Sequence, residues 1–182
     1  MSMPPPCKFT KEEIIQASLN LVRESGVGAI TARTLGARLG ASSKPIFSIF
    51  ENMEEVVTET LKAAKNEYNQ IIQIALSQQH PFKNVGTQYI LFAKKEPKLF
   101  QWLFMTEQNK EKDLTGILPL IDENYEKILA SIQEEYPVSK PTAEELYRHL
   151  WIYTHGIAAL TATKVCDFSR EEISRMLTEI FV

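Results

Sequence analysis

The stretch Thr31–Phe50, TARTLGARLGASSKPIFSIF, contains two very short helical patterns that are joined by Gly40. Their apolar residues recur at helical spacing: Leu35 and Leu39 in the first, and Ile46, Phe47 and Phe50 in the second. Nucleating a helix is costly and such short stripes bury little surface, so neither helix is stable alone. Gly40 can adopt the left-handed conformation that closes a tight turn between them.

A longer helix must pack across this pair, and residues 10–25 precede it with a helical pattern of their own. The three segments together predict a unit that ends in a helix-turn-helix. This arrangement is the standard device for placing a short helix in the major groove of DNA.

The same residues give the chain a resemblance to the tetracycline-repressor (TetR) family of bacterial regulators. It rests on Thr31–Ala32–Arg33, Gly40–Ala41–Ser42, Ile46–Phe47–Ser48–Ile49–Phe50 and Asn52–Met53–Glu54–Glu55–Val56, in that order. Phe92–Ala93, Pro97 and Phe100 are similar to the family's middle region, and Trp151, His155, Gly156 and Leu160 to the tryptophan–histidine–glycine signature of one branch. The resemblance implies a repressor that binds pseudo-palindromic double-stranded DNA as a homodimer and responds to a small apolar effector.

Composition places the chain among ordinary globular proteins. Of its 182 residues, 44% are hydrophobic and 24% charged, which excludes a disordered chain. No apolar run reaches membrane-spanning length, and two cysteines form no disulfide framework or metal spacing, so we expect a cytoplasmic protein without a membrane partner. The net charge is −3, but residues 1–50 carry six basic and three acidic side chains, so the remainder is acidic. A basic N-terminal module next to an acidic remainder is typical of a protein that binds DNA. The alternative is a chance imbalance of a few charges.

Every periodic segment is typical of a helix, so we expect an all-α fold. Residues 1–52 would form the helix-turn-helix module, and a continuous long helix that starts at Met53 would join it to an effector-binding and dimerisation bundle over 53–182, with the module boundary near Ala63–Ala64. Four pairs predict helix starts by reciprocal capping: Thr10/Glu13, Asn52/Glu55, Thr142/Glu145 and Ser169/Glu172. We also expect a loop over 109–116 and a break bracketed by Pro137 and Pro141. Between them, a helix should start near Pro119 and carry Ile121, Tyr125, Ile128 and Ile132.

The second short helix is the candidate recognition element. Ser42 would cap it, with Lys44 and Pro45 in its first turn, and Ser43, Lys44 and Ser48 would face away from its apolar stripe. Helix N-termini at Thr31 and Ser42 offer amides to phosphates, and Arg33 could reach the DNA backbone or a minor-groove edge. The predicted DNA-binding residues are Thr31, Arg33, Ser42, Ser43, Lys44, Phe47 and Ser48. At the positions of Phe47 and Met53, many family members have a tyrosine and a lysine, which commonly contact phosphates. We therefore expect this chain to make fewer phosphate contacts than those members.

Two further sets of residues are predicted from the aromatic middle of the chain and from its C-terminal helices. An apolar effector would contact Tyr89, Trp102, Met105, Tyr125 and Tyr153, although such residues are more often simply core. A dimer seam would use small residues that let helices approach closely, together with apolar residues of the last helix: Thr154, Ala158, Ala162, Ile173, Leu177 and Phe181. The alternative is that the same faces pack within one chain.

His149, Trp151 and His155 raise the question of a metal or catalytic site. No H-E-x-x-H motif, no cysteine–histidine pair at ligand spacing and no glycine-rich phosphate loop accompanies them. We therefore expect Trp151 and His155 to pack in the bundle, with His155 hydrogen-bonded to a neighbouring helix, and we expect no enzyme, metal or cofactor. A helical enzyme or metal protein, and a helix-turn-helix scaffold that binds protein, remain as alternatives.

Overall fold

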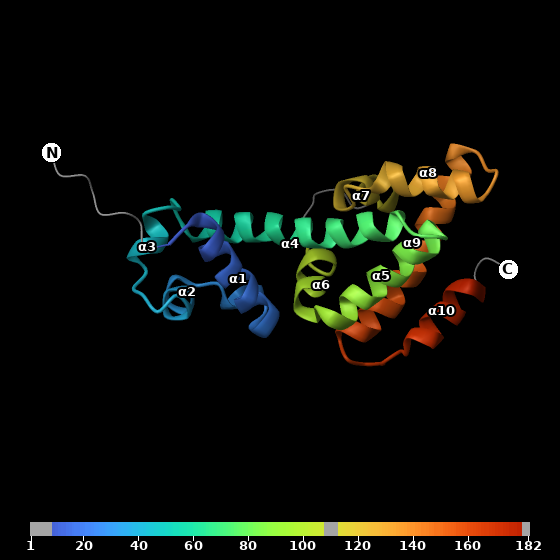
Figure 1. Ribbon diagram of the computed structural model, residues 1–182. Helices are drawn as coiled ribbons and strands as arrows, with labels where there is room; N and C mark the ends of the chain where they lie inside the picture. Colours follow the sequence, from blue (N-terminus) through green and yellow to red (C-terminus); the bar gives the residue numbers. More distant parts are fainter. Residues whose placement is uncertain (1–8, 108–112, 180–182) are drawn as a thin grey trace. The chain divides into compact units, whose positions relative to one another are not determined.

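The computed structural model describes residues 9–107 and 113–179, and this part of the chain is helical without a β-strand, which confirms the all-α prediction (Figure 1). The chain separates into two compact units, Met1–Asn66 and Glu67–Val182. Helix α4 (Met53–Leu76) is continuous across the division between them.

The first unit contains α1 (Lys11–Ser25), the 3₁₀ turn η1 (Val27–Ala29), α2 (Ala32–Arg38), α3 (Lys44–Phe47) and the first half of α4. Its core is made by fully buried apolar side chains from each α-helix: Ile14, Leu19 and Val22 of α1, Leu35 of α2, Ile46 of α3, and Val56 and Ala64 of α4. The short helices therefore bury their apolar stripes together with the longer ones.

Three of the predicted capping pairs mark helix starts. At α1 the amide of Thr10 donates to Glu13 Oε2 at 2.8 Å, and the amide of Glu13 donates to Thr10 Oγ1 at 3.1 Å. Ser169 and Glu172 form the same reciprocal pair before α10 (Arg170–Glu179). At α4 the amide of Glu55 donates to Asn52 Oδ1, but the Glu55 carboxylate accepts from the amide of Glu51 rather than from that of Asn52.

The fourth pair, Thr142/Glu145, was wrong as a helix start. Helix α9 (Lys140–Ala162) begins three residues earlier, and its cap is Ser139, whose Oγ accepts from the amide of Thr142 at 3.4 Å. Pro141 lies in the first turn, where a missing amide costs no helical hydrogen bond, so it does not bound a break as predicted.

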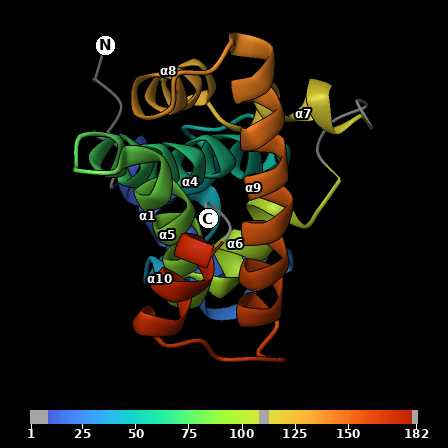
Figure 2. The same cartoon turned by 90° about the vertical axis from the view of Figure 1, so that its right-hand side faces the viewer.

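The second unit is a helical bundle built around α5 (Pro81–Lys95) and α9, which pack against each other (Figures 1 and 2). Helix α10 packs on α5, and α6 (Pro97–Phe104) contacts both α5 and α9. Helices α7 (Leu114–Ile121) and α8 (Tyr125–Glu135) pack against α9 near its start. Gly86 allows the close approach of these helices, because a Cβ there would lie 3.2 Å from Thr154 Cγ2 of α9 and 3.5 Å from Leu177 Cδ1 of α10.

Residues 114–135 form two helices where the sequence predicted a loop and then one helix. Helix α7 begins at Leu114, inside the expected loop, and contains Pro119, which was expected to start a helix. The chain turns at Asp122, whose Oδ1 accepts from the amide of Asn124 at 2.9 Å. Asp and Asn form such local turns in competition with a helix, which explains why one continuous helix does not form here.

Glu59 of α4 lies between two lysines in the first unit, and this arrangement makes a testable prediction. Its Oε2 is 2.8 Å from Lys11 Nζ and its Oε1 is 2.7 Å from Lys62 Nζ. Hydrogen bonds from Lys11 and Lys62 lower the pKa of Glu59 from 4.5 to about 2. Because the folded pKa is the lower one, this stabilisation is present above pH 4.5 and is lost as the pH falls toward 2.

The Glu59→Gln variant should therefore lose less thermal stability than the wild type as the pH falls from 4.5 to about 2, because glutamine has no charge to titrate. Melting temperatures of both proteins, followed by circular dichroism across the range, measure the difference. Curves of the same steepness would show that the lysine pairs contribute nothing to folding.

Candidate nucleic-acid interface and effector site

The connection between α2 and α3 is a tight turn at Gly40. Gly40 has φ +62°, so the prediction of a left-handed glycine is confirmed. The turn lies directly against α2, since the amide of Ala41 donates to the carbonyl of Gly36 at 2.9 Å. A Cβ on Gly36 would lie 3.0 Å from the Ala41 carbonyl oxygen, so this close approach also depends on a glycine.

Helix α3 is shorter than its sequence pattern suggested. It ends at Phe47 instead of Phe50, and its cap is Ser43 rather than Ser42. Ser43 has a helical backbone and makes no side-chain capping bond, because a side-chain cap requires extended geometry. Ser42 is exposed and the predicted capping role is wrong.

The outward face of α3 carries three of the predicted DNA-binding residues. Lys44, Phe47 and Ser48 are exposed, and Ile46 is fully buried. Phe47 is 47% exposed and does not belong to the core stripe to which its spacing assigned it, because Ile46 and Phe50 fill that role. Ser43, the residue before the first turn of α3, is half-buried.

Arg33 of α2 and Lys44 of α3 are exposed cations of the first unit. Within residues 9–107 and 113–179, neither Arg33 of α2 nor Lys44 of α3 forms an ion pair, whereas Arg38 pairs with Glu24 and Lys11 with Glu59. Thr31, also exposed, caps α2: its Oγ1 accepts from the amide of Thr34 at 3.1 Å. Arg33 and Lys44 can therefore bind an external anion without first breaking an intramolecular ion pair.

The five predicted effector residues do not gather around one cavity. Tyr89 and Trp102 are buried, Tyr125 packs on Tyr147 with ring centroids 5.6 Å apart, and Met105 and Tyr153 are exposed. Tyr153 is 38% exposed and does not line the small void described next. Of the five, only Tyr89 lines the small internal void beside α5 and α9, whose volume is about 10 Å³.

A polar cluster that the sequence did not reveal lies next to this void. Tyr147 donates its hydroxyl to Asp122 Oδ2 at 2.8 Å, and both residues are buried. The hydroxyl of Tyr89 is 2.8 Å from His155 Nδ1, which confirms the expected link from His155 to a neighbouring helix. Burial lowers the pKa of His155. The sequence D-E-N at 122–124, between apolar residues, was the one available sign of a polar turn.

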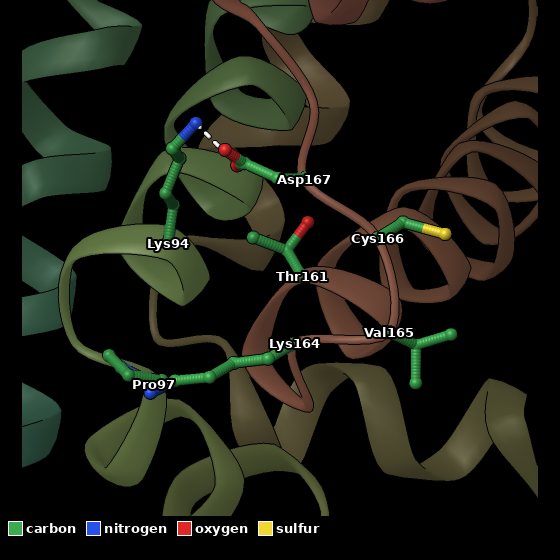
Figure 3. A pocket seen from close by; sticks show the side chains of 7 residues that line it. All are labelled: Lys94, Pro97, Thr161, Lys164, Val165, Cys166 and Asp167. Atoms are coloured by element: carbon green, nitrogen blue, oxygen red, sulfur yellow. Dashed lines mark ion pairs between the residues drawn. The ribbon is translucent and has the colours of Figure 1, made fainter.

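A second depression lies at the surface where α5, α6 and the end of α9 meet (Figure 3). Its volume is about 300 Å³, and Figure 3 shows Lys94 reaching Asp167, with Nζ and Oδ1 2.6 Å apart, while the Cys166 side chain points away from Thr161. Most of its lining residues are exposed and several are charged. Such a lining does not suit the apolar effector that the sequence suggested.

The predicted dimer residues lie inside the chain's own fold. Ala158 and Ile173 are 0% exposed, and Thr154, Ala162 and Leu177 are also buried, so the predicted seam is wrong and the alternative of intrachain packing holds. The small side chains allow α9 to approach α5 closely, and α10 packs on α5 as well. Phe181 lies outside the described residues. The opposite face of α9 instead exposes Ile152, Tyr153 and Leu160, with Gly156 between them.

In the part of the chain that the structure describes, no group of His, Cys, Asp and Glu side chains is arranged to hold a metal ion. None of the described helices combines the length and the apolar character needed to cross a bilayer. No family model matches the chain, and a search of curated proteins finds no match. The resemblance to the TetR family thus stays a prediction from the quoted motifs.

Proposed function

We propose that the protein is a ligand-responsive transcriptional regulator that binds double-stranded DNA as a homodimer. The observation that carries this proposal is the exposed face of α3, from which Lys44, Phe47 and Ser48 project outward. Arg33 of α2 is also exposed and forms no ion pair with a described residue. A short helix anchored by Ile46 and Phe50 and presented by the turn at Gly40 suits insertion into a major groove. Arg33 and Lys44 would neutralise backbone phosphates.

The outward face of α9 is the proposed contact with a second copy of the chain. Ile152 is 54% exposed and Leu160 is 40% exposed, two turns apart on the same face. Gly156 lies between them, and a Cβ there would meet nothing within 4 Å, so a partner helix has room to approach. A two-fold arrangement of such a face would give the dimer that a pseudo-palindromic operator requires.

The effector would act through α4, which belongs to both units. Tyr68 in its second half packs against Tyr89, Phe92 and Phe104, with ring centroids 4.9 to 6.1 Å apart. A ligand that displaces this aromatic cluster would bias the position of the same helix whose first half carries Val56 and Glu59.

The test is binding of the purified full chain to labelled random duplexes, followed by fluorescence anisotropy at a series of salt concentrations. We expect binding that weakens steeply as salt rises, because counterion release from phosphates drives it. Absence of binding at low salt would refute the proposal. It would favour instead a scaffold that binds a protein partner through the exposed Phe47.

A further inference from the structure

Four aromatic residues line the void beside α5 and α9. These are Tyr68, Tyr89, Tyr147 and Trp151, and the other lining residues are Val85, Gly86, Leu150 and Thr154. Its volume of about 10 Å³ admits one group the size of a water molecule. A larger organic ligand could place only a small head group there.

Asp122 does not line the void, but its buried carboxylate contacts Tyr147, which does. Asp122 is only 4% exposed, yet among the described residues no lysine, arginine or histidine forms an ion pair with it. Its oxygens accept from the Tyr147 hydroxyl and from the amide of Asn124. Burial raises the pKa of Asp122, and these two hydrogen bonds oppose that rise only in part. A positively charged ligand would offset the cost of the buried carboxylate.

Tyr147 connects the carboxylate to the void, because its ring lines the void while its hydroxyl contacts Asp122 Oδ2 at 2.8 Å. Donation to a carboxylate polarises a phenol and makes the face of its ring more negative. Burial, assisted by the charge of Asp122, raises the pKa of Tyr68, Tyr89 and Tyr147 well above usual values, so these phenols remain neutral. Neutral aromatic faces around a small space attract a cation.

The lining also supplies a hydrogen-bond acceptor, Thr154, and one half-buried ring, Trp151. Thr154 donates its hydroxyl to the carbonyl of Leu150 at 2.9 Å, so its oxygen retains lone pairs for an incoming N–H group. Trp151 is half-buried, lines the void and stacks on His155 with ring centroids 4.6 Å apart. An apolar tail could leave the void along this indole.

We propose that this site binds a protonated primary amine with a short apolar tail. The ammonium group occupies the void among Tyr68, Tyr89 and Tyr147, Asp122 supplies the compensating charge, and the tail passes Trp151. The small volume favours a primary ammonium over a bulkier quaternary one. Its role as an effector rests on the proposed function above, whereas the binding itself does not.

The test compares three probes of equal chain length on the full chain without DNA: hexylammonium, hexan-1-ol and hexanoate. Isothermal titration calorimetry should show hexylammonium binding at least about tenfold more tightly than hexan-1-ol, with hexanoate weakest, because only the cation gains from Asp122. In a Trp102→Phe background Trp151 is the remaining tryptophan, and its emission should change on binding. Equal affinity for amine and alcohol, or no binding of the amine, would overturn the proposal.

Asp122→Asn should remove the preference for the amine, while Glu123→Gln, which removes the same charge at the adjacent exposed position, should retain it. A preference that survives Asp122→Asn in a folded protein contradicts the assignment. If Asp122→Asn does not fold, the comparison of the three probes on the wild-type chain still tests the proposal. If the chain binds the amine but not DNA, the amine site is supported and its role as an effector of a regulator is refuted. If the chain binds DNA but not the amine, the amine site is refuted and the proposed regulatory function is retained.

Discussion

Ala158→Arg is expected to unfold the second unit, whereas Ile152→Arg is expected to leave it folded and to prevent dimerisation. Both residues are on α9, six positions apart, but Ala158 is 0% exposed and Ile152 is 54% exposed. A guanidinium at Ala158 would be buried where α9 packs against α5, without room or a partner, at a cost of roughly 4 kcal/mol or more. An arginine at Ile152 remains in water in the monomer, where its effect on stability should stay within about 0.5 kcal/mol.

Circular dichroism melts and sedimentation velocity on the two variants measure these effects. Ile152→Arg should melt like the wild type and sediment as a monomer, because a dimer through this face would bury two arginines close to the two-fold axis. Ile152→Lys and Leu160→Arg serve as further tests of the same face. A folded Ala158→Arg would contradict the packing of α9, and an unchanged dimer in Ile152→Arg would exclude the outward face as the interface.

Removing the two unpaired cations should have the second large effect. The double variant Arg33→Ala/Lys44→Ala loses two phosphate contacts in each half-site of the proposed complex. Each contact contributes about 0.9 to the slope of log affinity against log salt, so the slope of the dimer should decrease by about 3.6. Binding at low salt should fall by orders of magnitude, alike on operator and random duplexes if the lost contacts are to phosphates alone.

Lys62→Ala is the matched control for this prediction. Lys62 is also an exposed cation of the first unit, but its Nζ is 2.7 Å from Glu59 Oε1 and it lies far along α4 from α3 in sequence. Its removal should leave the salt slope unchanged. A slope that is the same in the double variant and the wild type would show that α2 and α3 do not contact the DNA backbone.

The sequence predicted the helical class and most helix starts, because these depend on local signals. Reciprocal capping by Thr10/Glu13 and Ser169/Glu172 involves residues three positions apart, and the left-handed Gly40 follows from the lack of a side chain. The prediction of a loop over 109–116 was wrong for its last residues, because residues 114–121 form a helix that packs on α8 and α9. Such long-range support is not visible in a local polar pattern.

The faces of α9 show why sites were harder to predict than helices. The small residues Thr154 and Ala158 fit a seam between any two closely packed helices, and periodicity does not say whether the second helix belongs to the same chain. Likewise, the partnership of Tyr147 with Asp122 joins residues 25 positions apart that only the fold brings together. Aromatic composition indicated a cluster but not which rings would line a void.

The most direct test of the proposed regulator is a selection of DNA fragments from a random library by the full-length chain, repeated at low and moderate salt. We expect enrichment of a pseudo-palindromic sequence with two half-sites, and loss of that enrichment in Arg33→Ala/Lys44→Ala and in Ile152→Arg. The first variant lacks the phosphate contacts and the second lacks the dimer, although both remain folded. A selection that enriches no sequence at either salt concentration, from a protein that is folded by circular dichroism, would contradict the proposed function.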